Sequence, residues 1–322
     1  MEALPQETVK VRGLTKRYGK VLAINDLNLT LYEGDLFGFI GPNGAGKTTT
    51  LRILATTLSA DSGEVFIAGH SLPREVEKVR AIIGFMPDFL GIYDDIAVRD
   101  YLEFFARAYH LPPHLRNYAI EEVSTLTRIA PLLGLPVESL SRGMKQRLGL
   151  AKTLLHNPRV ILLDEPASGL DPKARVELRD IIKGLQKQGR TIIISSHILS
   201  DLADLCNKVG IIEKGKMLLV EETESLLRKI STGLKRLKLR TLGNHEELSR
   251  ILGEYRDVSG IEWDGEDLII TFSGSDRDLS ELLRYLIEKE LPLYSFSEIQ
   301  GSLESAYMKI IEGAGEAPAL CS

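Results

Sequence analysis

The stretch LFGFIGPNGAGKTTTLRIL, residues 36–54, decides the fold of this chain of 322 residues. Its first six residues form a near-continuous apolar strand that runs into a glycine-rich turn, and residues 49–58 have the pattern of a buried helix. Between them, residues 41–48 match the phosphate-loop pattern G-x-x-x-x-G-K-[ST] in its strand–turn–helix context. A plain glycine-rich turn is the alternative, but it leaves the match at every fixed position unexplained. We therefore expect a nucleotide phosphate site here.

The residues of this phosphate loop have separate chemical roles. Glycines let the backbone approach phosphate oxygens, and inward-pointing N–H groups form an anion nest. Lys47 is expected to reach the β- and γ-phosphates and assist catalysis, and the Thr48 hydroxyl to bind Mg²⁺. The helix that opens at Lys47 adds the positive end of its dipole. The residues expected to bind the nucleotide here are Gly41, Pro42, Asn43, Gly44, Ala45, Gly46, Lys47, Thr48 and Thr49.

Two carboxylates end a second apolar strand, VILLDEP, residues 160–166. Ligands bind open α/β sheets outside the carboxyl ends of the strands, so this pair is expected at the same edge as the phosphate loop. Asp164 then supports Mg²⁺ through its water shell, and Glu165 polarises a water molecule as general base. The alternative, an acid pair that caps a helix before Pro166, is weakened by the presence of the phosphate loop.

A histidine and a tyrosine complete the expected site. His197 follows the next strand, in SSH at 195–197, and is expected to sense the γ-phosphate and orient the attacking water. The alternative is a capped loop histidine. Tyr18 lies 23 residues before Gly41, where an aromatic ring can stack on adenine. A surface tyrosine in a turn is the alternative for Tyr18.

A second phosphate-binding pattern lies in LSRGMKQRLGLA, residues 140–151, here called the signature stretch. Ser141 is a natural N-cap, and the apolar residues after it give the helix a buried stripe. Its free N–H groups and hydroxyl suit an anion, although the phosphate loop already holds one nucleotide. A two-fold dimer resolves this, because each signature helix then caps the γ-phosphate bound by the partner. The alternative is a capped amphipathic helix with a solvated basic face.

The set GPNGAGKT, LSRGMKQR, VILLDEP, SGLD and SSH, in this order, resembles the ATP-binding subunits of ABC transporters over roughly residues 8–220. The resemblance implies an α/β fold: a P-loop NTPase (RecA-like) core with an antiparallel β subdomain and a helical subdomain at about 89–157. It also implies a head-to-tail dimer that sandwiches two ATP molecules with Mg²⁺. Lys47, Glu165 and His197 would be catalytic. Ser141 and Gly143 would contact the partner's γ-phosphate, and Asp171 in SGLD would communicate between the sites.

Two positions depart from the family pattern. Arg142 stands where the signature usually has glycine, and we expect it to be tolerated because Ser141 and Gly143 are kept. Asp88, in GFMPDFLG, stands where the family usually has glutamine. A carboxylate is a harder Mg²⁺ ligand than an amide, so Asp88 is expected to couple metal occupancy to the helical subdomain.

Strands alternate with helices through the first part of the chain, which indicates a mostly parallel sheet. We expect a nucleotide-binding domain at 1–221 and a linker at 222–233. The region 234–312 follows the order β-α-β-β-α-β of a small ferredoxin-like α+β domain, with a final helix at about 302–312. Residues 313–322 are expected to form a flexible tail. An Asp264-Gly265 turn favours a tight hairpin inside this region.

Composition narrows the partners. A net charge of −5 and a pI near 5.8 argue against a dedicated nucleic-acid binder. Two cysteines without a CxxC pair argue against structural zinc or a disulfide framework. No apolar run approaches the roughly 18 residues needed to cross a bilayer, so transport requires a separate integral-membrane permease. We expect a cytoplasmic protein, peripheral on the cytoplasmic face of the membrane, as a homodimer or as a heterodimer with a related ATPase.

The C-terminal region also bears on the direction of transport. An α/β appendage of this kind resembles the tail of exporter-type subunits that pair with ABC-2 permeases, of the drug or multidrug type, whereas sugar-import subunits more often carry a β-barrel-like appendage. Residues 89–106 are expected either to grip the permease or to form ordinary core of the helical subdomain. The alternatives for the whole chain are an importer ATPase, a soluble ATP-dependent switch and an ATP sensor without hydrolysis.

Overall fold

The structure is a computed structural model that describes residues 6–89, 91, 95–226, 235–243 and 245–299. The chain divides into two compact units, Met1–Thr223 and Glu224–Ser322. The final helix predicted at about 302–312 and the tail at 313–322 lie outside the described residues, as do residues 227–233 of the predicted linker. Residues 223–226, which the sequence pattern places in the linker, are helical instead.

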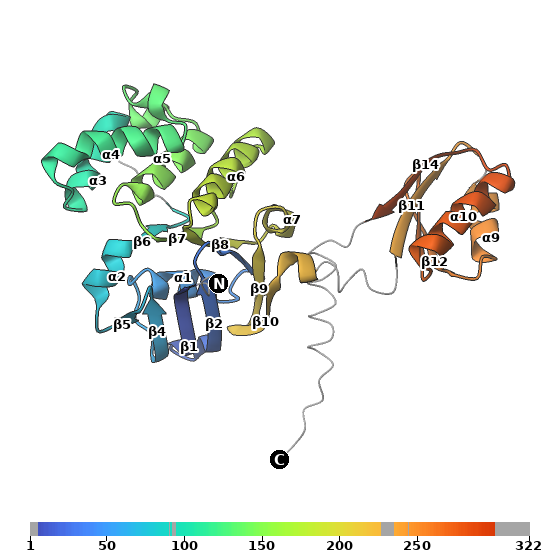
Figure 1. The fold of residues 1–322 in the computed structure, drawn as a ribbon, viewed down its shortest axis with the longest axis horizontal. Helices are drawn as coiled ribbons and strands as arrows, with labels where there is room; N and C mark the ends of the chain where they lie inside the picture. Colours follow the sequence, from blue (N-terminus) through green and yellow to red (C-terminus); the bar gives the residue numbers. More distant parts are fainter. Residues whose placement is uncertain (1–5, 90, 92–94, 227–234, 244, 300–322) are drawn as a thin grey trace, which may run out of the picture. The chain divides into compact units, whose positions relative to one another are not determined.

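The first unit is built on a six-stranded sheet in the order β10-β9-β3-β8-β7-β6 (Figure 1). The four strands β3, β6, β7 and β8 and their neighbour β9 run parallel, and β10 pairs antiparallel with β9. The central strands β3, β7 and β8 are buried along their whole length because helices and a second sheet cover both faces. The bounds are β3 Leu36–Ile40, β6 Ile83–Met86, β7 Val160–Asp164, β8 Thr191–Ser196, β9 Lys208–Glu213 and β10 Lys216–Glu222.

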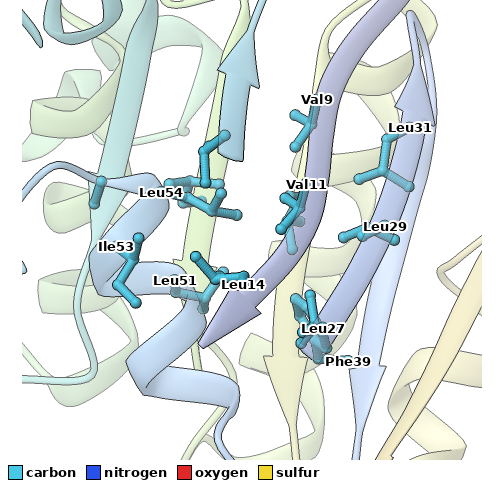
Figure 2. Packing of buried hydrophobic residues seen from close by; sticks show 14 of the residues in the cluster. Val9, Val11, Leu14, Leu27, Leu29, Leu31, Phe39, Leu51, Ile53 and Leu54 are labelled. Carbon is cyan, nitrogen blue, oxygen red and sulfur yellow. The ribbon is translucent and has the colours of Figure 1, made fainter. Parts of the chain in front are cut away.

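A second, antiparallel sheet of four strands has the order β2-β1-β4-β5. Its strands are β1 Glu7–Tyr18, β2 Val21–Tyr32, β4 Ser62–Ile67 and β5 His70–Leu72. Alternate residues of β1 and β2, such as Val9 and Leu29, point inward to the same cluster as Leu51 and Leu54 of α1 (Figure 2). The core that fixes the position of α1, and with it the phosphate loop, is therefore shared between both sheets.

Helices occupy the remaining parts of the first unit. Helix α1 ends at Leu54, earlier than the predicted 49–58, because the chain turns at Thr56, whose φ is 61°. Three helices, α3 to α5, gather in the helical subdomain that the resemblance implied (Figure 1). The bounds are α1 Lys47–Leu54, α2 Val76–Ile82, α3 Val98–Ala108, α4 Pro113–Leu126, α5 Arg142–Leu154, α6 Pro172–Lys187 and α7 Leu199–Ala203, with short 3₁₀ turns at Ala130–Leu132 and Val137–Ser139.

The second unit has the predicted order β-α-β-β-α-β, and its antiparallel sheet runs β12-β13-β11-β14. Leu237, Ile270 and Phe272 alternate on one face of the sheet and pack against apolar residues of the two helices, such as Leu282. The sequence expectation of a ferredoxin-like α+β domain is confirmed. The bounds are β11 Lys235–Thr241, α9 His245–Gly253, β12 Val258–Asp264, β13 Asp267–Phe272, α10 Asp276–Glu288 and β14 Leu293–Ile299.

Within the described part of the chain, no helix is both long and apolar enough to span a lipid bilayer.

Candidate functional site

The phosphate loop, residues 41–48, joins β3 to α1, and its geometry requires glycine at two positions. Gly46 is the N-cap of α1 with a φ of 110°, a left-handed conformation that glycine adopts readily. A Cβ on Gly46 would lie 2.6 Å from the Ala23 carbonyl oxygen, and one on Gly41 would lie 2.2 Å from the Ile212 carbonyl oxygen. Between them, Pro42, Asn43 and Gly44 are exposed, so the loop presents its backbone outward.

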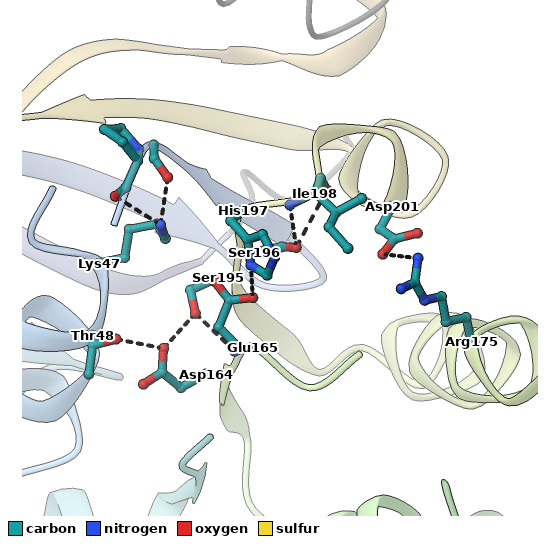
Figure 3. Close-up of polar contacts among 12 residues, drawn as sticks. Lys47, Thr48, Asp164, Glu165, Arg175, Ser195, Ser196, His197, Ile198 and Asp201 are labelled. Carbon is teal, nitrogen blue, oxygen red and sulfur yellow. Dashed lines mark hydrogen bonds and ion pairs between the residues drawn. The ribbon is translucent and has the colours of Figure 1, made fainter. Parts of the chain in front are cut away.

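Lys47 lies buried at the centre of this loop (Figure 3). Its Nζ donates to the Gly41 carbonyl at 2.6 Å and to the Pro42 carbonyl at 3.2 Å. Burial lowers the pKa of the Lys47 ammonium, and the carboxylates of Glu165 and Asp164 act in the opposite direction. The side chain therefore spans the loop at the point where its carbonyl groups converge, close enough to both acids for their charges to act on it.

Asp164, the last residue of β7, is a buried carboxylate that connects the loop to the sheet. The Thr48 hydroxyl donates to its Oδ1 at 3.0 Å, and the Ser195 hydroxyl donates to the same oxygen at 2.6 Å (Figure 3). Thr48 lies in the first turn of α1 and Ser195 lies in β8, so three separate elements meet at one carboxylate oxygen. A hydroxyl and a carboxylate side by side are the hard oxygen ligands that suit Mg²⁺, which protein sites hold by one or two side chains together with phosphates and water.

Glu165 and His197 form a contacting pair beside this group. The His197 Nδ1 lies 2.8 Å from the Glu165 Oε2 (Figure 3). The Glu165 side chain is 16% exposed and that of His197 is 49% exposed, so the pair lies at the boundary between the protein and water. Glu165 has a φ of 50°, a conformation that costs a non-glycine residue about 1–3 kcal/mol and is concentrated at functional sites.

Ser195 is a site residue that the sequence patterns did not single out. Besides donating to Asp164, its hydroxyl accepts from the Glu165 backbone N–H at 3.1 Å, and that N–H also lies 3.2 Å from the Ser195 carbonyl. Ser195 thus holds both acids in place. No local sequence signal marks this contact, because it depends on the register of β7 and β8, in which Asp164 pairs with Ser195.

Tyr18 and Asp88, two further residues expected in the site, are both exposed. Tyr18 ends β1 with 48% of its surface exposed, and the Lys16 ammonium lies 5.9 Å from the centre of its ring. Its ring is available for stacking. Asp88 is exposed in a bend two residues after β6. Among the described residues it forms no hydrogen bond or ion pair with Thr48 or Asp164, so its role as a metal residue stays a prediction.

The signature stretch begins α5, and Ser141 is its N-cap, as predicted. The Ser141 hydroxyl is exposed and accepts from the Met144 N–H at 3.4 Å. No acidic residue lies in the first turn of α5, so the positive end of the helix dipole is left uncompensated there. Ser141 and Gly143 lie on the helical subdomain, whereas the phosphate loop lies on the core between β3 and α1 (Figure 1).

The SGLD loop, residues 168–171, packs against the start of α5. The Arg142 guanidinium lies against Gly169, where a Cβ would come within 2.3 Å of Cζ. Asp171 is the N-cap of α6, and its carboxylate accepts from the Ala174 N–H at 2.9 Å. A Cβ on Gly143 would lie 3.0 Å from the Cβ of Ala174. The signature stretch and the SGLD loop are thus neighbours within one chain, and Arg142 fills the space between them.

Comparison with known proteins identifies the family to which this chain belongs. The profile described as "ABC transporter" matches residues 24–168. The bacitracin transport ATP-binding protein BcrA of Bacillus licheniformis is 33% identical over 306 residues, which cover 95% of this chain and 97% of the relative. This chain belongs to the ABC transporter family. The uncharacterized ABC transporter ATP-binding protein YhcH of Bacillus subtilis is 30% identical over 304 residues, 94% of this chain and 95% of the relative.

Solved structures agree with this assignment of an ABC ATP-binding subunit. CbiO1 of Clostridium perfringens, described as part of the ABC transporter complex CbiONQ, has a TM-score of 0.64 and 26% identity, covering 70% of this chain and 95% of that one. ABC ATP-binding subunits are ATPases coupled to transport, and they work with membrane permease partners. The expected family, fold class, ATP-binding activity and enzyme class are therefore confirmed.

Proposed function

We propose that this ABC ATP-binding subunit belongs to an exporter, binds ATP with Mg²⁺ in the site described above, and dimerises around two ATP molecules to drive a separate permease. The observation that carries the proposal is the contact of His197 with Glu165 beside the Thr48–Asp164–Ser195 group. These groups supply a general base, its orienting partner and oxygen ligands at one edge of a sheet, as hydrolysis of a phosphoanhydride requires.

Each side chain has a definite task in this proposal. The phosphate loop and Lys47 bind the β- and γ-phosphates, and Tyr18 stacks on adenine. Thr48 and Asp164 hold Mg²⁺, which offsets the negative charge that develops on the phosphates. Glu165 accepts a hydrogen bond from the attacking water and takes up its proton at the carboxylate. His197 holds that carboxylate by the 2.8 Å contact, so the base is oriented before the reaction begins.

The exposed start of α5 supports the proposed dimer. Ser141 and Gly143 are proposed to bind the γ-phosphate held by the partner subunit, where the uncompensated helix dipole favours an anion. Asp171 and the SGLD loop lie at the same surface and are proposed to carry information between the two sites. Asp88 is proposed to link the metal to the helical subdomain. The subunit is proposed to lie at the cytoplasmic face of the membrane, where the permease binds it.

Export is favoured over import by the names of relatives and by the second unit. BcrA is named for bacitracin transport and matches nearly the whole chain. The Nod factor export ATP-binding protein I of Ralstonia nicotianae is 34% identical over 208 residues. The ferredoxin-like unit also differs from the β-barrel-like appendage expected of a sugar-import subunit. The cargo is determined by the permease.

The test replaces the proposed base. Glu165→Gln is expected to lower ATP turnover by roughly 10²–10⁴-fold, the range for a positioned general base, and to accumulate an ATP-bound dimer measurable by size-exclusion chromatography with light scattering. Glu64→Gln is the matched control, because Glu64 is an exposed carboxylate that lies 4.0 Å from the Arg12 guanidinium, away from the phosphate loop and the acid pair. Ser141→Arg in the Glu165→Gln chain is expected to prevent the dimer while each monomer still binds ATP.

The results separate the parts of the proposal. Wild-type turnover in Glu165→Gln contradicts the assignment of the base. A dimer that persists in the Ser141→Arg chain contradicts the role of the signature stretch. For transport, the tagged Glu165→Gln chain is purified with ATP from gently solubilised membranes of its native cell. A co-purifying polytopic membrane protein supports the proposal, and exclusively soluble partners favour an ATP-dependent switch.

A further inference from the structure

The His197 segment and the SGLD loop are connected by one arginine on α6. The Arg175 Nε donates to the Leu170 carbonyl, in the SGLD loop, at 3.2 Å. The same guanidinium reaches α7, where its Nη1 lies 3.7 Å from the Asp201 Oδ2 (Figure 3). Asp201 comes four residues after His197 in the chain. We call these two contacts of Arg175 the Arg175 bridge.

The Arg175 bridge closes a ring that contains the proposed base. From Glu165, whose carbonyl accepts from the Ser168 N–H at 3.0 Å, the chain turns into the SGLD loop and reaches Leu170. The bridge crosses from Leu170 to Asp201 on α7. Helix α7 follows His197 directly, and His197 returns to Glu165 at 2.8 Å. A displacement of the SGLD loop therefore changes the position of His197 relative to Glu165 unless the bridge breaks.

The Arg175–Asp201 contact of the bridge is longer than a hydrogen bond, so its strength depends on the position of the SGLD loop. At 3.7 Å the Arg175–Asp201 contact is an ion pair but too long for a hydrogen bond. Among the described residues, the Asp201 Oδ2 is a buried oxygen without a hydrogen-bond partner, and the Asp201 side chain is only 18% exposed. A buried acceptor in that state is unfavourable. A shift of Arg175 toward Asp201 gives the Asp201 Oδ2 a hydrogen-bond donor. The positions of the SGLD loop and of α7 are therefore energetically linked.

From this ring we infer that Arg175 is a positioning residue for ATP hydrolysis: it transmits the position of the SGLD loop to His197 and so sets the orientation of Glu165. Among the hydrogen bonds and ion pairs of the described residues, Arg175 contacts Leu170 and Asp201 and no residue of the phosphate loop. The inference rests on the proposed roles of Glu165 and His197. It adds a route by which the loop that packs against the signature stretch controls the catalytic pair of the same chain.

The matched control is on the same helix. Arg179 also pairs with α7, at 3.9 Å to Asp201 and 3.1 Å to Asp204. It makes no contact with the SGLD loop among the hydrogen bonds and ion pairs of the described residues. Arg175→Met and Arg179→Met thus each remove a cation that holds α7, but only Arg175→Met disconnects the loop from it.

The experiment measures ATP turnover of the full chain against ATP concentration. Arg175→Met is expected to lower kcat by roughly 3- to 30-fold, the usual size of coupling through such a contact, with KM for ATP unchanged, and Arg179→Met to change kcat by less than about twofold. In Arg175→Lys the ammonium can contact either the Leu170 carbonyl or Asp201 but not both at once, so this variant is expected to retain more kcat than Arg175→Met. In a His197→Ala background, single-turnover rates are expected to be the same with and without Arg175→Met, because there is no histidine left to position.

Two results overturn the inference: wild-type kcat in Arg175→Met, or the same additional loss in the His197→Ala background as in the wild type. The second result means that Arg175 acts on the fold rather than on His197. If Arg175→Met fails to fold, Asp201→Asn tests the other end of the bridge with the same readouts. The proposed roles of Glu165 and His197 are tested separately, since wild-type turnover in Glu165→Gln or in His197→Ala contradicts them whatever Arg175→Met does.

Discussion

The most direct test of how the acid pair is held is Ser195→Ala. The substitution removes one oxygen and leaves no bulky side chain to accommodate. It deletes the 2.6 Å hydrogen bond to the Asp164 Oδ1, while the Glu165 N–H keeps the Ser195 carbonyl at 3.2 Å as its acceptor. The net loss is therefore one short hydrogen bond to a buried carboxylate. Thr48 remains as the donor to Asp164, at 3.0 Å.

The expected magnitude follows from that single bond. Hydrogen bonds to charged groups contribute about 1.5–3 kcal/mol to folding, so we expect the free energy of unfolding of the first unit to fall by about 2 kcal/mol. With an m-value of about 3 kcal/mol/M, suitable for a unit of this size, the urea midpoint should fall by about 0.7 M. Because Ser195 orients the proposed Mg²⁺ ligand, half-saturating Mg²⁺ for turnover should rise by roughly 10- to 100-fold.

The assay uses a feature of the sequence. The chain has one tryptophan, Trp263, which lies in the second unit. Tryptophan fluorescence therefore follows the second unit, and circular dichroism follows the whole chain. Ser195→Ala should lower the urea midpoint measured by circular dichroism and leave the midpoint measured by tryptophan fluorescence unchanged. Ser196→Ala is the control, since the Ser196 hydroxyl bonds to the neighbouring Ile198 backbone and not to Asp164. Its Mg²⁺ requirement should equal that of the wild type.

A Ser195→Ala chain with the wild-type urea midpoint and the wild-type Mg²⁺ requirement would refute this reasoning. It would mean that Thr48 alone, through its 3.0 Å bond, is sufficient to hold Asp164. A fall in the midpoint without any change in Mg²⁺ requirement would assign Ser195 to stability only, and would contradict Asp164 as the metal ligand that it orients.

Two further predictions concern the edge of the first unit and the sheet of the second. Tyr18→Ala is expected to weaken ATP binding by about 1–3 kcal/mol through lost stacking, whereas Tyr18→Phe keeps the ring and should bind ATP as the wild type does. If fluorescent-nucleotide titration gives Tyr18→Ala the wild-type affinity, the stacking role is contradicted. In the second unit, hydrogen bonds from Arg240 and Lys238 lower the pKa of Asp267 from 3.8 to about 2. The stability that Asp267 contributes is therefore complete above pH 3.8 and lost as the pH falls toward 2. Asp267→Asn should remove this pH dependence from the unfolding transition followed by Trp263 fluorescence. An unchanged pH dependence in this variant would rule out Asp267 as its source.

The short elements of the first unit could not be predicted from the sequence. Strands β5 and β6 have only three and four residues, His70–Leu72 and Ile83–Met86. Runs this short contain too little periodicity to indicate a strand. They exist because neighbours already in place accept their hydrogen bonds: β6 pairs in parallel with β7, and β5 pairs with β4. The helices α2 and α7, of seven and five residues, went unpredicted for the same reason.

The longer patterns were more informative. The strand before the phosphate loop and the β-α-β-β-α-β order of the second unit were both predicted within a few residues. In each case an apolar run or alternation extends over a whole element, and a turn or cap residue marks its end. The hairpin of β9 and β10 turns at Lys214 and Gly215, and both residues have a positive φ.

By itself the sequence predicted the family, the phosphate loop, the two carboxylates at the end of an apolar strand and the ATPase activity, because these depend on residue types at fixed local spacing. Only the tertiary structure decided which groups touch across strands and helices. Ser195 on Asp164, Arg142 on Gly169 and the Arg175 bridge all join residues at least five positions apart on different elements or loops. No local pattern encodes such contacts, since they arise when strand register and helix packing bring distant side chains within hydrogen-bonding distance.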